Sequence, residues 1–286
     1  MKVKVTKRSG NSSNSSNTIS ASSNGANGGK SKKDRITVVK TQDREFILTK
    51  SATFSFREAY NALRTNIIFS IPADGCKIIG ITSAERAEGK SANTLNMAIS
   101  FAETGARVLL IDCDLRKPKL GRLLEIKSSP GIANVLVNMQ SINRSIKKTK
   151  FENLDVLLSG GVQPNPTELL VSEKFGKLLQ DLSRDYDYIF IDTPPVNVVA
   201  DASIISKHLS GYVFVVRQGI SESDSVINAL EQLKFVNAKI LGFLRMVLLI
   251  KKIIGKSIIN IIMATDTVIA TDQDMAILRI VLKHRP

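Results

Sequence analysis

The sequence predicts an α/β domain of the P-loop type, in which helices cover both faces of a mostly parallel sheet. Two observations carry this prediction. Short apolar runs alternate with amphipathic stretches between residues 36 and 243, and one of these runs leads directly into Gly-Lys-Ser at residues 89–91. Runs that are apolar on both faces and separated by helices are typical of a parallel sheet covered on both sides.

The expected elements follow the two periodicities of the apolar residues. We expect strands at KIIGITS (77–83), RVLLIDCD (107–114), LDVLLSG (154–160), YDYIFIDTPP (186–195), YVFVVRQ (212–218) and KILGFL (239–244). We expect helices at residues 55–70, 90–104, 166–183, 200–208 and 222–237.

Composition divides the chain of 286 residues into three regions. Residues 1–36 are rich in Ser, Asn and Gly, and such a segment buries too little apolar surface to order itself, so we expect a disordered arm. Residues 37–243 form the predicted P-loop domain. Residues 244–286 fit neither the strand nor the helix pattern and form an atypical basic tail.

The formal net charge of +14 is concentrated at the two ends of the chain. Residues 1–35 carry eight basic and one acidic residue, and residues 244–286 carry seven basic and three acidic residues. The segment 36–243 keeps a net charge of only +3, so the charge does not indicate a nucleic-acid partner for the central domain.

Several features favour a cytoplasmic chain. Cys76 and Cys113 have no metal-site or disulfide spacing, and no apolar segment of a signal peptide follows the first lysines. Lysines interrupt the apolar run at 244–263, which is too charged for a membrane-spanning helix.

The loop at residues 84–91 carries the predicted nucleotide site. It lies between a strand and a helix, the context in which Gly-Lys-Ser forms a P-loop. Backbone N–H groups face the phosphates, Lys90 neutralises their charge, and the Ser91 hydroxyl ligates Mg²⁺. In the alternative, a chance match, Lys90 is an ordinary surface lysine. The predicted ATP-binding residues are Ala84, Ala87, Glu88, Gly89, Lys90, Ser91 and Ala92.

Three aspartates follow apolar strands and extend this site. Asp112 and Asp114 end one predicted strand, and Asp192 ends another. Ligands of open parallel sheets bind outside the carboxyl ends of the strands, so these carboxylates should converge on the phosphates. A single strand-end Asp could cap a helix, but three beside a P-loop indicate metal-dependent nucleotide chemistry.

Four blocks together resemble a known family, the bacterial tyrosine kinases of the CpsD/CapB type that regulate capsule and exopolysaccharide synthesis. These blocks are ITSAERAEGKS, LLIDCDLRKPKL, SGGVQPNPTELL and YDYIFIDTPPVNVVADA, and the resemblance covers residues 54–243. The Asp-x-Asp-x-Arg element in the second block is the most diagnostic, because ordinary P-loop ATPases lack it.

The resemblance implies an ATP-dependent protein-tyrosine kinase that phosphorylates itself and other proteins. Lys90, Asp112 and Asp114 would be catalytic, with Asp112 as the base or orienting group for the tyrosine hydroxyl. Ser91, Asp114 and Asp192 would hold Mg²⁺. Arg116 and Lys117 could stabilise phosphate charge, or form a solvated surface.

The family resemblance also implies partners and a location. Such a kinase is a separate chain at the inner face of the plasma membrane, activated by a membrane-embedded polysaccharide co-polymerase adaptor. Family members form rings through a Glu-x-x-Arg-x-x-Arg helix. This chain has Glu58 and Arg64 but Asn61 at the middle position, so we expect weaker ring assembly.

Two other departures concern the loop and the acceptor site. Ala87 stands where the family has a glycine. The family also carries a C-terminal tyrosine cluster as phosphate acceptor, whereas the last tyrosine here is Tyr212.

Two other functions stay open. A partition or septum-site ATPase usually has a signature lysine five residues before Lys90, where this chain has Glu85. A nucleotide-binding scaffold that contacts the polysaccharide machinery without transferring phosphate would explain the lost tyrosines. No guanine-reading Asn-Lys-x-Asp element is present, which favours ATP over GTP.

The tail at 244–286 has the pattern of an out-of-frame tyrosine-rich segment. Codons that join the third base of one residue to the first two of the next give glycine at Met263–Ala264 and Met275–Ala276 without any codon choice. Neighbouring Ile-Ile, Ala-Thr and Asp-Thr junctions permit tyrosine, so an alternating Tyr-Gly series is possible. The competing interpretation of 244–263 is a cationic amphipathic helix on an anionic membrane.

We predict that the reading frame shifts near Leu244. Sequencing the coding DNA should show that the displaced frame encodes alternating tyrosine and glycine between residues 261 and 277. Codons at the Ile-Ile and Ala-Thr junctions that exclude tyrosine in that frame would end this hypothesis.

Overall fold

The computed structural model describes residues 47–72, 74–253 and 256–264. The chain divides into two compact units, Met1–Val39 and Lys40–Pro286. The predicted arm at 1–36 lies outside the described residues, and everything below concerns the second unit.

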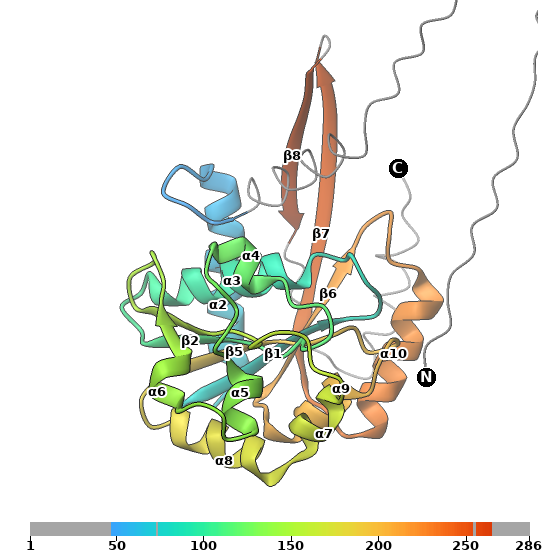
Figure 1. Ribbon diagram of the computed structural model, residues 1–286. Helices are drawn as coiled ribbons and strands as arrows, with labels where there is room; N and C mark the ends of the chain where they lie inside the picture. The colour runs from blue at the N-terminus through green and yellow to red at the C-terminus, as the bar shows by residue number, and fades with distance from the viewer. Residues whose placement is uncertain (1–46, 73, 254–255, 265–286) are drawn as a thin grey trace, which may run out of the picture. The chain divides into compact units, whose positions relative to one another are not determined.

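An eight-stranded sheet forms the centre of this unit, in the order β3-β4-β2-β5-β1-β6-β7-β8 (Figure 1). The six inner strands are parallel to one another, and β3 and β8 pair antiparallel at the two edges. The strands are β1 Lys77–Ser83, β2 Val108–Asp112, β3 Ile146–Lys148, β4 Leu154–Leu157, β5 Tyr188–Asp192, β6 Gly211–Arg217, β7 Ile240–Ile253 and β8 Lys256–Ala264.

Helices connect the parallel strands, as the crossover between parallel neighbours requires. The helices are α2 Phe54–Ser70, α3 Lys90–Ala102, α4 Leu120–Leu124, α5 Ile132–Leu136, α6 Ile142–Ser145, α7 Pro166–Val171, α8 Glu173–Leu182, α9 Asp201–Ile205 and α10 Ser223–Phe235, with a 3-10 turn η1 at Ser206–His208. No helix in the described part of the chain is long and apolar enough to cross a bilayer.

The sheet is buried on both faces, which confirms the predicted fold class. Alternate residues of one strand enter different cores: Val108 and Leu110 of β2 pack toward α2 and α3, whereas Leu109 and Ile111 pack toward α5, α7 and α8. A third cluster joins β6 to α10. In Figure 1, α2 and α3 lie over one face of the sheet and α7, α8 and α10 over the other.

Every predicted strand and helix is present, with two differences in the helices. The helix expected at 166–183 divides at Ser172 into α7 and α8. The helix expected at 200–208 ends at Ile205 and continues as the turn η1. The sequence analysis did not identify the short elements α4, α5, α6 and β3, because segments of three to five residues carry too few positions to establish a period.

The tail departs most from expectation. Strand β7 runs through the predicted boundary at residue 243 and pairs with β6 as far as Met246, so the sheet keeps its partner for β6. The interpretation of 244–263 as an amphipathic helix is wrong, because β7 continues to Ile253 and pairs antiparallel with β8. Residues 265–286, which include part of the proposed tyrosine-coding pattern, lie outside the described residues.

Candidate active site

The loop between β1 and α3 has the backbone of an anion-binding turn. Gly89 is the N-cap of α3 and has φ 90°, a left-handed conformation that glycine adopts without steric cost. Ala87 also has a positive φ of 65°, which is unfavourable for a residue with a Cβ and explains a glycine preference at this position. The helix beyond the turn spans thirteen residues, so its N-terminal N–H groups and dipole can attract a phosphate.

Lys90 and Ser91 open α3 and are nearly buried at the carboxyl end of the sheet. The alternative in which Lys90 is an ordinary surface lysine is therefore wrong. Burial lowers the pKa of Lys90, and the carboxylates of Asp192 and Asp114 act in the opposite direction. Because burial disfavours the charged form of Lys90, approaching phosphate oxygens would stabilise its ammonium group.

The strand-end aspartates converge as predicted. Asp112 ends β2 and Asp192 ends β5, and the two residues are direct register partners on neighbouring parallel strands. Both side chains are fully buried, whereas that of Asp114, two residues beyond β2, is partly exposed.

Asp192 is poised between neutral and charged forms. Burial raises the pKa of Asp192 to about 6, while Lys90 and the hydroxyls of Ser91 and Thr94 limit the rise. Its Oδ1 accepts a hydrogen bond from the Thr94 hydroxyl at 3.3 Å. Its buried Oδ2 has no hydrogen-bond partner within the described part of the chain. A buried carboxylate oxygen without a partner is costly unless a ligand satisfies it.

Asp112 is anchored by the backbone. Its Oδ1 accepts from the N–H of Asp114 at 3.2 Å, and its Oδ2 accepts from the N–H of Leu120 at 3.3 Å. Burial, Asp192 and Asp114 together raise the pKa of Asp112 well above its ordinary value. The charge of a neighbouring carboxylate thus adds to desolvation in favouring the protonated form of Asp112.

These residues fit a magnesium ion. Mg²⁺ prefers oxygen ligands and normally keeps several waters beside one or two carboxylates and the nucleotide phosphates. The unpartnered Asp192 Oδ2, the Ser91 hydroxyl and Asp114 supply that donor chemistry. In the described ranges no group of three or more His, Cys, Asp or Glu side chains forms a metal cluster, so the protein oxygens alone do not form a closed cage.

Glu88 faces away from the phosphate turn and fastens the loop to the end of β6. Its side chain is fully buried; Oε2 accepts from the N–H of Glu85 at 2.8 Å, and Oε1 accepts from the Ser221 hydroxyl. Arg217 adds a bond to the carbonyl of Ala87 at 2.9 Å. The carboxylate of Glu88 is therefore engaged within the protein, and only the backbone N–H of this residue can bind a phosphate.

Arg116 pairs with a buried carboxylate, Asp201. This contact supports neither stabilisation of phosphate charge nor a solvated surface as the role of Arg116. Its Nε donates to Asp201 Oδ2 at 2.9 Å, and its NH2 donates to the Thr167 hydroxyl at 2.7 Å. Asp201 is fully buried at the start of α9, and Thr167 lies in α7. The guanidinium thus joins two helices, whereas the neighbouring Lys117 side chain is exposed.

A cleft of about 710 Å³ lies beside the loop, between Glu85, Asn197 and the polar face of α10. Glu85 Oε1 accepts hydrogen bonds from Asn197 Nδ2 at 3.3 Å and from the Ser225 hydroxyl at 3.4 Å. The position of the partition-ATPase signature lysine is therefore occupied by a carboxylate held on the wall of this cleft.

Sequence reasoning missed the residues that support the loop from other elements. Arg217 ends β6 and Ser221 follows it, and the rule that placed the aspartates also applies to them, since the carboxyl ends of parallel strands share one edge. Thr94 lies one helical turn after Lys90 and is identifiable by that spacing. Tyr60 of α2, which donates to Asn93 Oδ1 at 2.8 Å and through it reaches the carbonyl of Gly89, has no such local signal.

The fold and the site define a P-loop nucleotide-binding α/β protein. A family model described as AAA domain matches residues 76–233. The septum site-determining protein MinD of Pyrococcus horikoshii, solved in complex with Mg-ADP, superposes with a TM-score of 0.51 at 27% identity, covering 59% of this chain and 69% of that one.

More specific similarity is to tyrosine kinases. The chain is 36% identical to the putative tyrosine-protein kinase CapB of Staphylococcus aureus and 38% identical to the tyrosine-protein kinase YwqD of Bacillus subtilis. Each alignment covers 65% of this chain, with 81% of CapB and 78% of YwqD. The solved chimerical protein CapA2B2 gives a TM-score of 0.63 at 36% identity over 66% of this chain and 83% of that one.

The chain therefore belongs to the family of bacterial tyrosine-protein kinases that includes CapB and YwqD.

We predict that Arg116→Ala destabilises the fold. Removing the guanidinium leaves the buried Asp201 carboxylate without its cation, at a cost of about 3 kcal/mol in the free energy of unfolding. Urea denaturation measures the loss, and Lys117→Ala, which removes an exposed charge, serves as the control. Unchanged stability in Arg116→Ala with weakened nucleotide binding would instead place the guanidinium on the phosphates.

We also predict a pH signature of Asp192 in the nucleotide-free protein. Its folded pKa of about 6 lies above the ordinary value of 3.8, so the folded state holds the proton more tightly and ionisation reduces stability as pH rises. Asp192→Asn removes this loss. Its stability relative to the parent chain should increase by about 1 kcal/mol between pH 5 and pH 7.

Urea denaturation of both proteins at the two pH values, without Mg²⁺ or nucleotide, measures this change. A difference in stability that stays constant between pH 5 and pH 7 would mean that Asp192 is already ionised at pH 5.

Proposed function

We propose that this chain transfers the γ-phosphoryl group of ATP to tyrosine hydroxyls, on itself or on other proteins, in the control of capsule or exopolysaccharide synthesis. The single observation that supports this most is the approach of Lys90 to Asp192 and Asp114 at the carboxyl edge of the sheet, where Asp112 is the register partner of Asp192. Membership of the tyrosine-kinase family supplies the acceptor chemistry.

The chain contributes positioning and charge to this reaction. Backbone N–H groups of Ala84 and of residues 87–92 bind the phosphates, and Lys90 neutralises charge as the bond from phosphorus to the leaving oxygen of ADP breaks. The tyrosine oxygen forms the new bond to phosphorus. Its proton passes to the ionised carboxylate of Asp112, and burial, which raises the pKa of that carboxyl, makes the carboxylate a stronger base.

Ser91, Asp114 and Asp192 would hold Mg²⁺, which supplies charge neutralisation between the phosphate oxygens when bound. Within the chain, Thr94 keeps one oxygen of Asp192 in place at 3.3 Å and leaves the other available. Lys90 is the cation already facing this carboxylate, so Asp192 also holds the lysine at the phosphate site.

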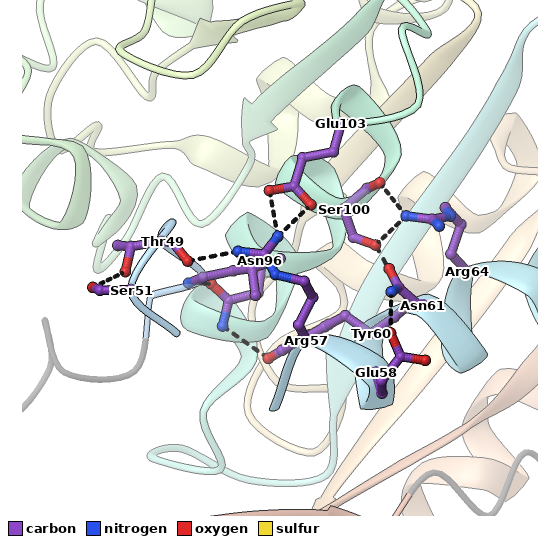
Figure 2. Close-up of polar contacts among 11 residues, drawn as sticks. Thr49, Ser51, Arg57, Glu58, Tyr60, Asn61, Arg64, Asn96, Ser100 and Glu103 are labelled. Carbon is purple, nitrogen blue, oxygen red and sulfur yellow. Dashed lines mark hydrogen bonds and ion pairs between the residues drawn. The ribbon is translucent and has the colours of Figure 1, made fainter. Parts of the chain in front are cut away.

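The proposal extends to partners and location. A membrane-embedded adaptor would activate the kinase at the inner face of the plasma membrane, and copies of the chain would form a ring weakened by Asn61. Asn61 Nδ2 donates to Glu58 Oε1 at 2.8 Å, and Arg64 donates to the carbonyl of Ser100 at 2.5 Å (Figure 2). The motif side chains are thus engaged within one chain, which supports weak assembly.

The tail forms a separate part of the proposal. Residues 244–286 would be an out-of-frame replacement of a tyrosine-rich acceptor segment, following an N-terminal arm at 1–36 and a kinase domain at 37–243. The absence of tyrosine after Tyr212 supports this, and also favours a second candidate function, a nucleotide-binding scaffold without phosphate transfer. The partition-ATPase alternative loses support, because Glu85 stands at the signature position and is engaged with Asn197.

Phosphotyrosine formation tests the proposal. The full chain is incubated with Mg-ATP, a tyrosine-rich peptide and the cytosolic segment of a family adaptor. We expect phosphotyrosine on the peptide and a loss of at least about 100-fold in Lys90→Ala, because a charge-stabilising group at the transferred phosphate is removed. Lys117→Ala, an exposed lysine on the loop after β2, should keep the parent rate.

The outcomes separate the candidates. ATP binding without phosphotyrosine favours the scaffold. Release of inorganic phosphate that exceeds any phosphotyrosine, and is lost in Lys90→Ala, favours an ATPase of the partition type.

A further inference from the structure

A continuous chain of buried hydrogen bonds joins the segment before α2 to the phosphate loop. The N–H of Leu48 donates to Asn96 Oδ1 at 2.7 Å, and Asn96 Nδ2 donates to the Tyr60 hydroxyl at 2.8 Å. The Tyr60 hydroxyl donates to Asn93 Oδ1 at 2.8 Å, and Asn93 Nδ2 donates to the carbonyl of Gly89 at 2.9 Å. Figure 2 shows Tyr60 and Asn96 meeting between α2 and α3. We name this series the Leu48–Gly89 chain.

The two ends fix the direction of every bond in the Leu48–Gly89 chain. A backbone N–H can only donate and a carbonyl can only accept, so Asn96 must present its oxygen to Leu48 and Asn93 must present its nitrogen to Gly89. Tyr60 then has one arrangement that satisfies both amides, accepting from Asn96 and donating to Asn93. The orientations of both asparagines follow from this network, and neither amide can flip without losing bonds.

The last bond determines the geometry of the anion site. The carbonyl of Gly89 accepts both the Asn93 side chain and the Asn93 backbone N–H, at 2.9 and 3.1 Å. The Gly89–Lys90 peptide is planar and trans, so its N–H points opposite to its carbonyl. Holding the carbonyl toward α3 therefore holds the Lys90 N–H toward the hollow of the loop. A glycine at φ 90° has no side chain to keep this peptide plane, so Asn93 supplies the constraint.

Burial strengthens the hydrogen bonds of the Leu48–Gly89 chain. Tyr60, Asn93 and Asn96 are each about 1% exposed, so water cannot replace a lost partner easily. Burial also raises the pKa of Tyr60, which keeps its hydroxyl protonated and able to donate. Other α2 contacts hold the same interface: Arg57 pairs with Glu103 of the segment after α3 at 2.7 Å, and Arg64 with Ser100 (Figure 2).

We propose that Tyr60 is a positioning residue for nucleotide binding, which acts through Asn93 on the Gly89–Lys90 peptide of the phosphate loop. Helix α2 and the segment at Leu48 then set the geometry of the loop, so events on the outer side of α2 reach the nucleotide through these bonds. The proposal rests on the proposed function, since it concerns the same phosphate site. Tyr60 itself touches no phosphate and is not a catalytic residue.

Tyr60→Phe tests the proposal, with Tyr212→Phe as a matched control. Both tyrosines are about 1% exposed or less, and both hydroxyls donate within the chain, but that of Tyr212 donates to the carbonyl of Ala202 at 2.6 Å, away from the loop. The two variants therefore lose the same atom from equally buried positions. Thermal unfolding by circular dichroism sets a temperature at which the parent chain and both variants are fully folded.

Binding of fluorescently labelled ADP with Mg²⁺ to the full chain is then measured at that temperature. We expect Tyr60→Phe to raise the Kd about fivefold or more, because two hydrogen bonds of the Leu48–Gly89 chain are lost, and Tyr212→Phe to stay within about twofold of the parent. Equal Kd values for Tyr60→Phe and the parent chain, or equal weakening in the two variants, would overturn the proposal.

A double substitution sharpens the test. If Tyr60 acts through Asn93, adding Tyr60→Phe to Asn93→Ala should raise the Kd by less than about twofold further, since the route is already broken. Full additivity of the two changes would overturn the route. Phosphotyrosine formation is measured separately: weak binding in Tyr60→Phe alongside a parent chain that binds ADP but phosphorylates nothing sustains this inference and rejects the kinase proposal.

Discussion

The attraction between buried Lys90 and two carboxylates, Asp192 at the end of β5 and Asp114 just after β2, is the constraint on which the site depends. Asp112 and Asp192 are register partners without exposure to water, so desolvation raises both pKa values, and the charge of Asp192 raises the pKa of Asp112 further. Lys90 offsets part of this cost, but one oxygen of Asp192 keeps no partner in the described structure. A bound phosphate would give Lys90 a further counter-charge, and a metal ion would satisfy the free oxygen of Asp192.

The loop that carries Lys90 has one internal bond, from the N–H of Glu85 to Glu88, and is otherwise held by contacts from other elements. Two sets of contacts do this from opposite directions. Ser221 and Arg217 bind the first half of the loop from the end of β6, through Glu88 and the carbonyl of Ala87. The Leu48–Gly89 chain binds its last peptide from α2. Loop geometry therefore depends on two elements distant in sequence.

The tail shows the limits of a composition argument. Its first residues continue β7 and pair with β6 up to Met246, and the Met246 side chain packs against Gly89, where an added Cβ would collide with its methyl group. A segment can thus pair with the sheet even when its sequence fits neither the strand nor the helix pattern. The edge of β6 presents backbone N–H and C=O groups, and an extended segment with apolar side chains can bond to them. The proposed change of reading frame and a regular strand are compatible.

The sequence alone determined the six parallel strands, the phosphate loop and the three aspartates, because each depends on a local pattern. A buried strand, a Gly-Lys-Ser turn and a strand-end carboxylate are encoded within about ten residues, and parallel topology brings their ends together. Only the tertiary structure decided what the polar side chains contact. Arg116 pairs with Asp201, Glu88 turns inward to Ser221, and Tyr60 reaches the loop through Asn93. Each partner there is set by packing between distant segments, and one sequence carries no spacing signal for it.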